Sequence, residues 1–81
     1  MKLPRDVSSA ALIKRLQRFG YSITRQIGSH IRLVTLHGGE HHITVPNHAS
    51  IRVGTLNAIL SDIGVHLKLS KTEVIKELFE K

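Results

Sequence analysis

Residues 21–46, YSITRQIGSHIRLVTLHGGEHHITVP, decide the fold of this 81-residue chain. They contain three segments rich in β-branched residues, Tyr21–Gln26, His30–Leu36 and His41–Pro46, which are separated by short glycine-containing connections. Such segments favour extended chain, and short connections between them are typical of antiparallel pairing. We therefore expect a three-stranded antiparallel meander with the second segment in the centre.

Alternation along these segments predicts which side chains share a face of the sheet. The apolar face, expected to form the core, carries Tyr21, Ile23, Ile31, Leu33, Ile43 and Val45. The polar face carries Ser22, Thr24, Gln26, His30, Arg32, His42 and Thr44, interrupted by Val34 and Leu36. This assignment requires three-residue loops at 27–29 and 38–40, where glycine takes a positive φ angle. Val34 and Leu36 are expected to be covered by the third helix, by a loop or by a partner protein.

Amphipathic periodicity before and after the strands predicts three helices. The first is Ala10–Phe19 and the second is Val53–Gly64, with Thr55 and Asn57 as its expected caps. Ser70-Lys71-Thr72-Glu73 matches the capping-box pattern that opens a third helix. The residues expected to be buried are Leu12, Leu16, Phe19, Leu56, Ile59, Leu60, Ile63, Val74, Ile75, Leu78 and Phe79. Residues 1–81 are therefore expected to form one α+β domain, with all helices on one face of the sheet.

Composition narrows the classes of function. Twelve Lys and Arg against six Asp and Glu give a net charge of +6, which favours polyanionic partners such as RNA. The chain has no cysteine, which excludes disulfides and thiolate chemistry. The N-terminal stretch MKLPRDVSSAAL lacks the apolar run of a signal peptide, and no segment is apolar enough to span a membrane. We expect a cytoplasmic protein with no membrane partner.

Three motifs occur in a fixed order along the chain: Gly28-Ser29-His30, Thr44-Val45-Pro46-Asn47-His48, and Gly54-Thr55-Leu56-Asn57-Ala58-Ile59-Leu60. In this order and spacing the sequence resembles the HicA family of bacterial toxins. The resemblance implies a fold like that of double-stranded-RNA-binding domains and activity as an mRNA interferase. It also implies neutralisation by a HicB-type antitoxin that covers the active site. The histidine that is essential in the family falls on His30.

His30 also fits this chemistry on physical grounds. Cleaving RNA without a metal requires a base for the 2′-hydroxyl and an acid for the leaving 5′-oxygen, and histidine serves either role near neutral pH. Gly28 and Ser29 place His30 beside a turn whose backbone N–H groups a phosphate can approach. Arg32 is expected to bind phosphate from the same face, because it lies two residues further along the strand.

Other residues leave alternatives open. If a three-residue loop sets the register, His48 lies opposite His30 and is either a second proton-transfer group or a histidine of the turn. Arg25, Arg52, Lys14, Arg15 and Arg18 are either RNA contacts or solvated surface charges. His37, His41, His42 and His48 suggest a metal site, but adjacent strand residues point to opposite faces, so neither metal nor cofactor is expected.

The sequence thus predicts a metal-independent endoribonuclease toxin. Two alternatives are a non-catalytic RNA-binding module and an interaction protein whose basic surface meets an acidic partner.

Overall fold

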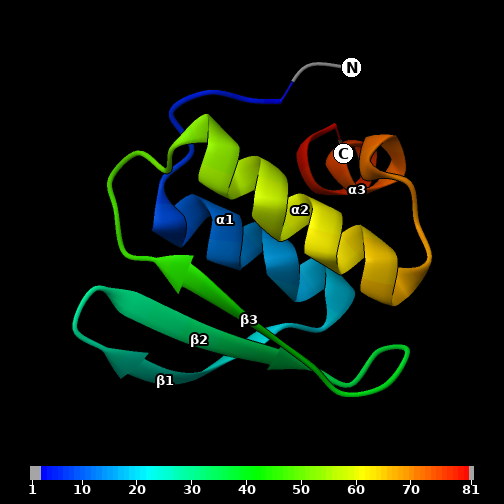
Figure 1. The fold of residues 1–81 in the computed structure, drawn as a ribbon, viewed down its shortest axis with the longest axis horizontal. Coiled ribbons are helices and arrows are strands. Elements are labelled where there is room, and N and C mark those ends of the chain that lie inside the picture. Colours follow the sequence, from blue (N-terminus) through cyan, green and yellow to red (C-terminus); the bar gives the residue numbers. More distant parts are fainter. Residues whose placement is uncertain (1–2, 81) are drawn as a thin grey trace.

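The computed structural model describes residues 3–80 and places helices and strands in the predicted order (Figure 1). The elements are α1 Ser9–Leu16, the short 3-10 helix η1 Gln17–Phe19, β1 Ser22–Ile27, β2 His30–Thr35, β3 His41–Pro46, α2 Val53–Leu67 and α3 Lys71–Phe79. The strands pair antiparallel in the order β1-β2-β3. The predicted α+β arrangement is confirmed.

The helices lie on one side of the sheet (Figure 1). Helices α1 and α2 pack against β3, and α3 packs against both of these helices. The core between the two layers includes Leu12, Leu16, Tyr21, Ile31, Leu33, Ile43, Val45, Leu56, Leu60, Ile63, Val74 and Leu78. The opposite side of the sheet, which we call the open face, has no helix over it (Figure 1).

Local hydrogen bonds explain where two of the helices begin. The Ser8 hydroxyl accepts a hydrogen bond from the Ala11 N–H at 3.0 Å and caps α1. At α3 the predicted capping box is present: the Ser70 hydroxyl accepts from the Glu73 N–H, and the Glu73 carboxylate accepts from the Ser70 N–H. The hydrogen bond from the Ser70 backbone holds the pKa of Glu73 below its usual value.

Helix α2 begins at Val53 as predicted and continues to Leu67, but its start is not capped as predicted. Its N-cap is Arg52, which makes no side-chain cap hydrogen bond. Thr55 and Asn57 lie inside the helix because it begins at Val53, so their expected role as caps is wrong. Asn57 instead accepts a hydrogen bond from the Lys71 ammonium at 2.6 Å, which links α2 to α3.

One predicted position for an apolar side chain is wrong, and one of the covers expected for two others is absent. Ile23 was expected in the core but is 54% exposed, because β1 is an edge strand and a hollow of about 350 Å³ separates it from α1. Val34 on the open face is partly exposed, and Leu36, the first residue after β2, is 75% exposed, so the third helix does not cover them. Along residues 3–80, no helix is long and apolar enough to cross a membrane.

Candidate active site

The turn between β1 and β2 holds the Gly-Ser-His motif at the edge of the open face. It consists of two residues, Gly28 and Ser29, because Ile27 pairs with His30. The predicted three-residue loop 27–29 is therefore wrong. Gly28 has a φ of +56°, and a Cβ there would meet no atom within 4 Å, so the backbone conformation alone favours glycine. The turn brings His30 to the first position of β2.

A β-bulge in β1 decides which side chains accompany His30. The register shifts between Ile23 and Arg25, so that Arg25 pairs with Arg32 and Ile27 pairs with His30. Directly opposed residues of antiparallel strands share a face, which places Arg25 and Ile27 on the open face. Gln26, which was predicted on that face, pairs with the buried Ile31 and lies on the helix side instead.

These side chains form a small hollow, which we call the open-face cavity. It has a volume of about 110 Å³ and is lined by Arg25, Ile27, His30, Arg32 and Thr44. The structure thus brings together three residues proposed from the sequence, His30, Arg32 and Arg25. It adds Thr44, which lies opposite Arg32, and Ile27. No sequence signal marked Ile27, because it was assigned to a loop.

The charges of the open-face cavity are not balanced. Arg25 and Arg32 oppose each other directly, and within residues 3–80 neither guanidinium forms an ion pair. Like charges in opposed positions of a sheet destabilise the pairing. A bound phosphate would compensate both charges, because guanidinium groups bind phosphate oxygens with charge-assisted hydrogen bonds. The arrangement leaves two positive charges without a partner in the described part of the chain.

His30 itself is exposed and available. In the described part of the chain, no hydrogen bond or ion pair engages its ring. On the neighbouring strand β3, His30 pairs with Pro46. An exposed imidazole between a cation and an open turn is able to exchange protons with a bound ligand.

His48 does not lie opposite His30. The β2–β3 connection is five residues long, 36–40, and Thr35 pairs with His41, so the expected three-residue loop 38–40 is wrong. His48 lies in the segment that follows β3, where its carbonyl oxygen accepts a hydrogen bond from the Ser9 N–H at 3.0 Å. This contact fixes the segment to the start of α1. A role for the His48 side chain in proton transfer stays a prediction.

The other predicted RNA-binding cations lie away from the open-face cavity. Arg15 donates a hydrogen bond to the carbonyl oxygen of Leu78 at 2.7 Å and lies 5.2 Å from the centre of the Phe79 ring. Arg18 approaches Glu77 at 3.7 Å. Arg15 therefore joins α1 to α3, and Arg18 joins η1 to α3. Two cations remain. Lys14 lines a hollow between α1 and the end of α3, together with Arg15 and Leu78. Arg52 is the N-cap residue of α2. Their RNA-binding role stays a prediction.

Most of the other histidines have structural contacts that the sequence did not reveal. His41 lies on the helix side, where Nδ1 is 2.7 Å from the Tyr21 hydroxyl and Nε2 is 3.3 Å from Asp62. The His66 ring stacks on His41 at 4.3 Å. His42 lies on the other face and contacts Glu40 at 2.7 Å. Within residues 3–80, no three His, Cys, Asp or Glu side chains form a metal-binding group.

Comparison with known protein families shows to which family this chain belongs. The family model described as the HicA toxin of bacterial toxin-antitoxin systems matches residues 9–65. The chain belongs to the HicA toxin family. The HicA match begins at the first residue of α1 and ends within α2, so it includes every residue of the open-face cavity. No curated protein and no solved structure matches the chain, and the expected likeness to double-stranded-RNA-binding domains stays a prediction.

Proposed function

We propose that this HicA-family protein is a metal-independent endoribonuclease that cleaves mRNA at the open-face cavity. The observation that carries the proposal is the direct opposition of Arg25 and Arg32 beside the exposed His30. Two unpaired guanidinium groups supply the charge that a scissile phosphate needs, and the imidazole supplies the proton transfer. Arg25 and Arg32 bind the phosphate, and Ile27 offers an apolar surface to the neighbouring base.

The proposed reaction uses the RNA as its own nucleophile. Neutral His30 takes the proton of the 2′-hydroxyl, the 2′-oxygen attacks phosphorus, and the bond from phosphorus to the 5′-oxygen breaks. Arg25 and Arg32 stabilise the extra negative charge of the pentacoordinate phosphorus. The leaving 5′-oxygen takes a proton from water, which reaches the exposed cavity, and the hydroxide formed takes the proton from His30, which restores the neutral imidazole. The products are a 2′,3′-cyclic phosphate and a 5′-hydroxyl.

The antitoxin is proposed to be a HicB-type protein that covers the open face. The support for this is the exposed apolar surface that Ile27, Val34 and Leu36 add to the cationic cavity. Apolar surface next to a charged site is typical of a protein interface. Binding there would block access of RNA to His30.

His30→Ala tests the catalytic role. We expect the purified wild type to cleave RNA in the presence of EDTA, and the variant to lose cleavage and growth arrest together. The loss should be about 10²-fold or more, because general acid–base catalysis contributes that much. The matched control is His42→Ala, which removes another exposed histidine of the same face. Cleavage by His30→Ala at the wild-type rate would overturn the proposal.

The chemical ends of the RNA products test the reaction mechanism, and measurement of RNA binding tests whether the protein is an enzyme. Hydrolysis by water would leave 5′-phosphate ends and would contradict attack by the 2′-hydroxyl. Retention of RNA affinity without cleavage by any variant, wild type included, would instead identify a non-catalytic RNA-binding module.

A further inference from the structure

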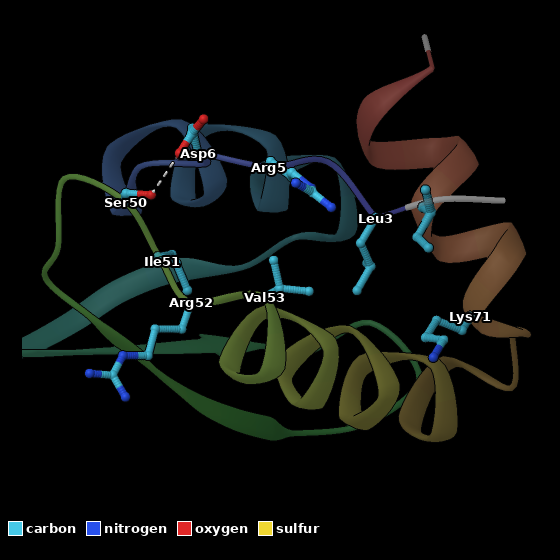
Figure 2. A pocket seen from close by; sticks show the side chains of 9 residues that line it. Leu3, Arg5, Asp6, Ser50, Ile51, Arg52, Val53 and Lys71 are labelled. Carbon is cyan, nitrogen blue, oxygen red and sulfur yellow. Dashed lines mark hydrogen bonds between the residues drawn. The ribbon is translucent and has the colours of Figure 1, made fainter.

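A second hollow lies on the helix side of the molecule, away from the open face. This helix-side groove has a volume of about 820 Å³, within the usual range of ligand pockets. Figure 2 shows it between the N-terminal segment with Leu3 and Arg5, the segment that leads into α2, and the start of α3 at Lys71. None of its lining residues lines the open-face cavity.

The rim of the groove is cationic. Arg5, Arg52 and Lys71 come from three different segments, and Figure 2 shows them at separate points around the hollow. One acid, Asp6, also lines the groove, but its carboxylate accepts a hydrogen bond from the Ser50 hydroxyl at 3.3 Å. The rim therefore carries an excess of positive charge and favours an acidic ligand.

The floor of the groove is apolar, and its apolar side chains are aliphatic. Leu3, Ile51, Val53 and Ile75 provide its apolar lining, and Val53 is 46% exposed. Among the residues that the structure describes, no aromatic side chain lines it. Nucleotide bases bind to single-strand sites chiefly by stacking on aromatic rings, so this lining does not favour a nucleic acid. Exposed aliphatic surface inside a cationic rim fits a peptide that carries both aliphatic and acidic side chains.

The beginning of α2 adds hydrogen-bond donors to the same place. Val53 is the first residue of the helix, the N-cap Arg52 provides no side-chain cap, and the first turn contains no acidic residue. Backbone N–H groups of a first helical turn have no partner within the helix, and the positive end of the helix favours a carboxylate. A ligand carboxylate at Val53 would accept hydrogen bonds from the N–H groups of the first turn of α2. It would contact the cationic rim at the same time.

We propose that the helix-side groove docks an acidic segment of a partner protein, with aliphatic side chains against Leu3 and Val53 and carboxylates toward Arg5, Arg52 and Lys71. Such a partner contacts the toxin on the opposite side from the open face. The docking site therefore functions whether or not the open face is occupied, and it does not depend on the proposed cleavage reaction.

The test is a titration of isotope-labelled protein with an end-blocked peptide of alternating leucine and glutamate, followed by nuclear magnetic resonance. We expect the amide signals of Arg5, Val53 and Lys71 to shift. The double variant Arg5→Gln/Lys71→Gln should bind about tenfold more weakly, because it removes two of the three rim charges that contact the peptide carboxylates. Lys68→Gln/Lys76→Gln, which removes the same charge elsewhere, should bind within about twofold of the wild type.

Several results would overturn the proposal. They are absence of peptide binding, peptide-induced shifts confined to the open face, and equal weakening in the two double variants. Displacement of the peptide from the groove by a short 2′-O-methyl oligonucleotide would assign the groove to nucleic acid. Displacement by inorganic phosphate at equal concentration would show a site for simple anions only. RNA cleavage by Arg5→Gln/Lys71→Gln is expected at the wild-type rate, so failure of this proposal and failure of the proposed function are distinguishable.

Discussion

The two guanidinium groups of the open face affect folding and binding in opposite directions. Arg25 and Arg32 occupy directly opposed positions, where like charges weaken the strand pairing. The same pair lines the open-face cavity and carries the phosphate binding that we propose. Sites that violate a local stability rule are commonly functional ones, because binding offsets the cost. The unfavourable pair is therefore an argument for function at this position.

Arg25→Gln should separate the two effects. We expect the free energy of unfolding to rise by roughly 0.2–1 kcal/mol, because the repulsion with Arg32 is removed. The cleavage rate should fall by about 10²-fold, because one of two groups that stabilise the phosphate is lost. Denaturant unfolding and a cleavage assay on the same preparation measure both quantities.

Arg5→Gln is the control for this pair of measurements. It removes the same charge from the other side of the molecule, where no second arginine lies opposite in a strand. Its unfolding free energy should change by less than about 0.5 kcal/mol. A lower stability of Arg25→Gln than of the wild type would contradict the argument.

At the residue scale, the sequence predicts the positions of only some of the residues that line the open-face cavity. Alternation within β2 placed His30 and Arg32 on one face, and both line the cavity. Alternation within β1 failed at Arg25 and Gln26, because the bulge reverses the facing of every residue that follows it. A bulge leaves no mark in the pattern of β-branched residues, so the sequence offers Arg25 as a candidate RNA contact, but its position opposite Arg32 is seen only in the structure.

At the scale of elements, the errors in the two loops had different consequences. The β2–β3 connection has five residues instead of three, and an even shift keeps the same faces together. Ile43 and Val45 are therefore buried as predicted. The β1–β2 turn has two residues instead of three, an odd change that would reverse the facing of all of β1. The bulge restores the predicted pairing of Ile23 with Leu33 at the far end of the strand.

The contact between α1 and α3 shows why surface charges were difficult to assign. Arg15 was placed on the solvated side of its helix, but α3 packs there and ends at Phe79. Its guanidinium binds the Leu78 carbonyl, which the end of a helix leaves without an internal partner. The position of α3 is a tertiary feature that the helical period of α1 does not contain.

Arg15→Ala tests this structural role. We expect a loss of about 1–2 kcal/mol in the free energy of unfolding, because a carbonyl loses its charged donor and the Phe79 ring loses its cation. Lys14→Ala, at the neighbouring position of the same helix, should change stability by less than about 0.5 kcal/mol. Thermal and denaturant unfolding of both variants provide the comparison. Equal stability of the two variants would show that the α1–α3 contact does not depend on Arg15.

At the scale of the whole molecule, one polar chain connects the two layers. The Asp62 carboxylate of α2 is an acceptor, so His41 Nε2 donates a hydrogen bond to it, and His41 Nδ1 accepts a hydrogen bond from the Tyr21 hydroxyl. His66 stacks on His41 and donates from Nε2 to the carbonyl oxygens of His37 and Gly39. These contacts fix the β2–β3 loop and the end of α2 relative to the sheet.

The buried end of this chain makes stability sensitive to alkaline pH. Burial, together with the nearby charge of Asp62, raises the pKa of Tyr21 from 10.0 to about 12. A folded-state pKa above the unfolded value means that the contribution to stability is complete below pH 10.0 and is lost as the pH rises toward 12. The shift corresponds to roughly 2–3 kcal/mol at most.

Tyrosinate absorbance measures this directly, because Tyr21 is the one tyrosine of the sequence and there is no tryptophan. In the folded protein the absorbance should begin to rise well above pH 10.0, whereas in denaturant it should rise around that value. Over the same range the free energy of unfolding should decrease, and Tyr21→Phe should lose this component of the decrease while being less stable at neutral pH. Asp62→Asn should lower the pKa of Tyr21, since it removes the negative charge that opposes ionisation. An ordinary tyrosine titration in the folded protein would mean that the Tyr21 hydroxyl is not held within the core by His41.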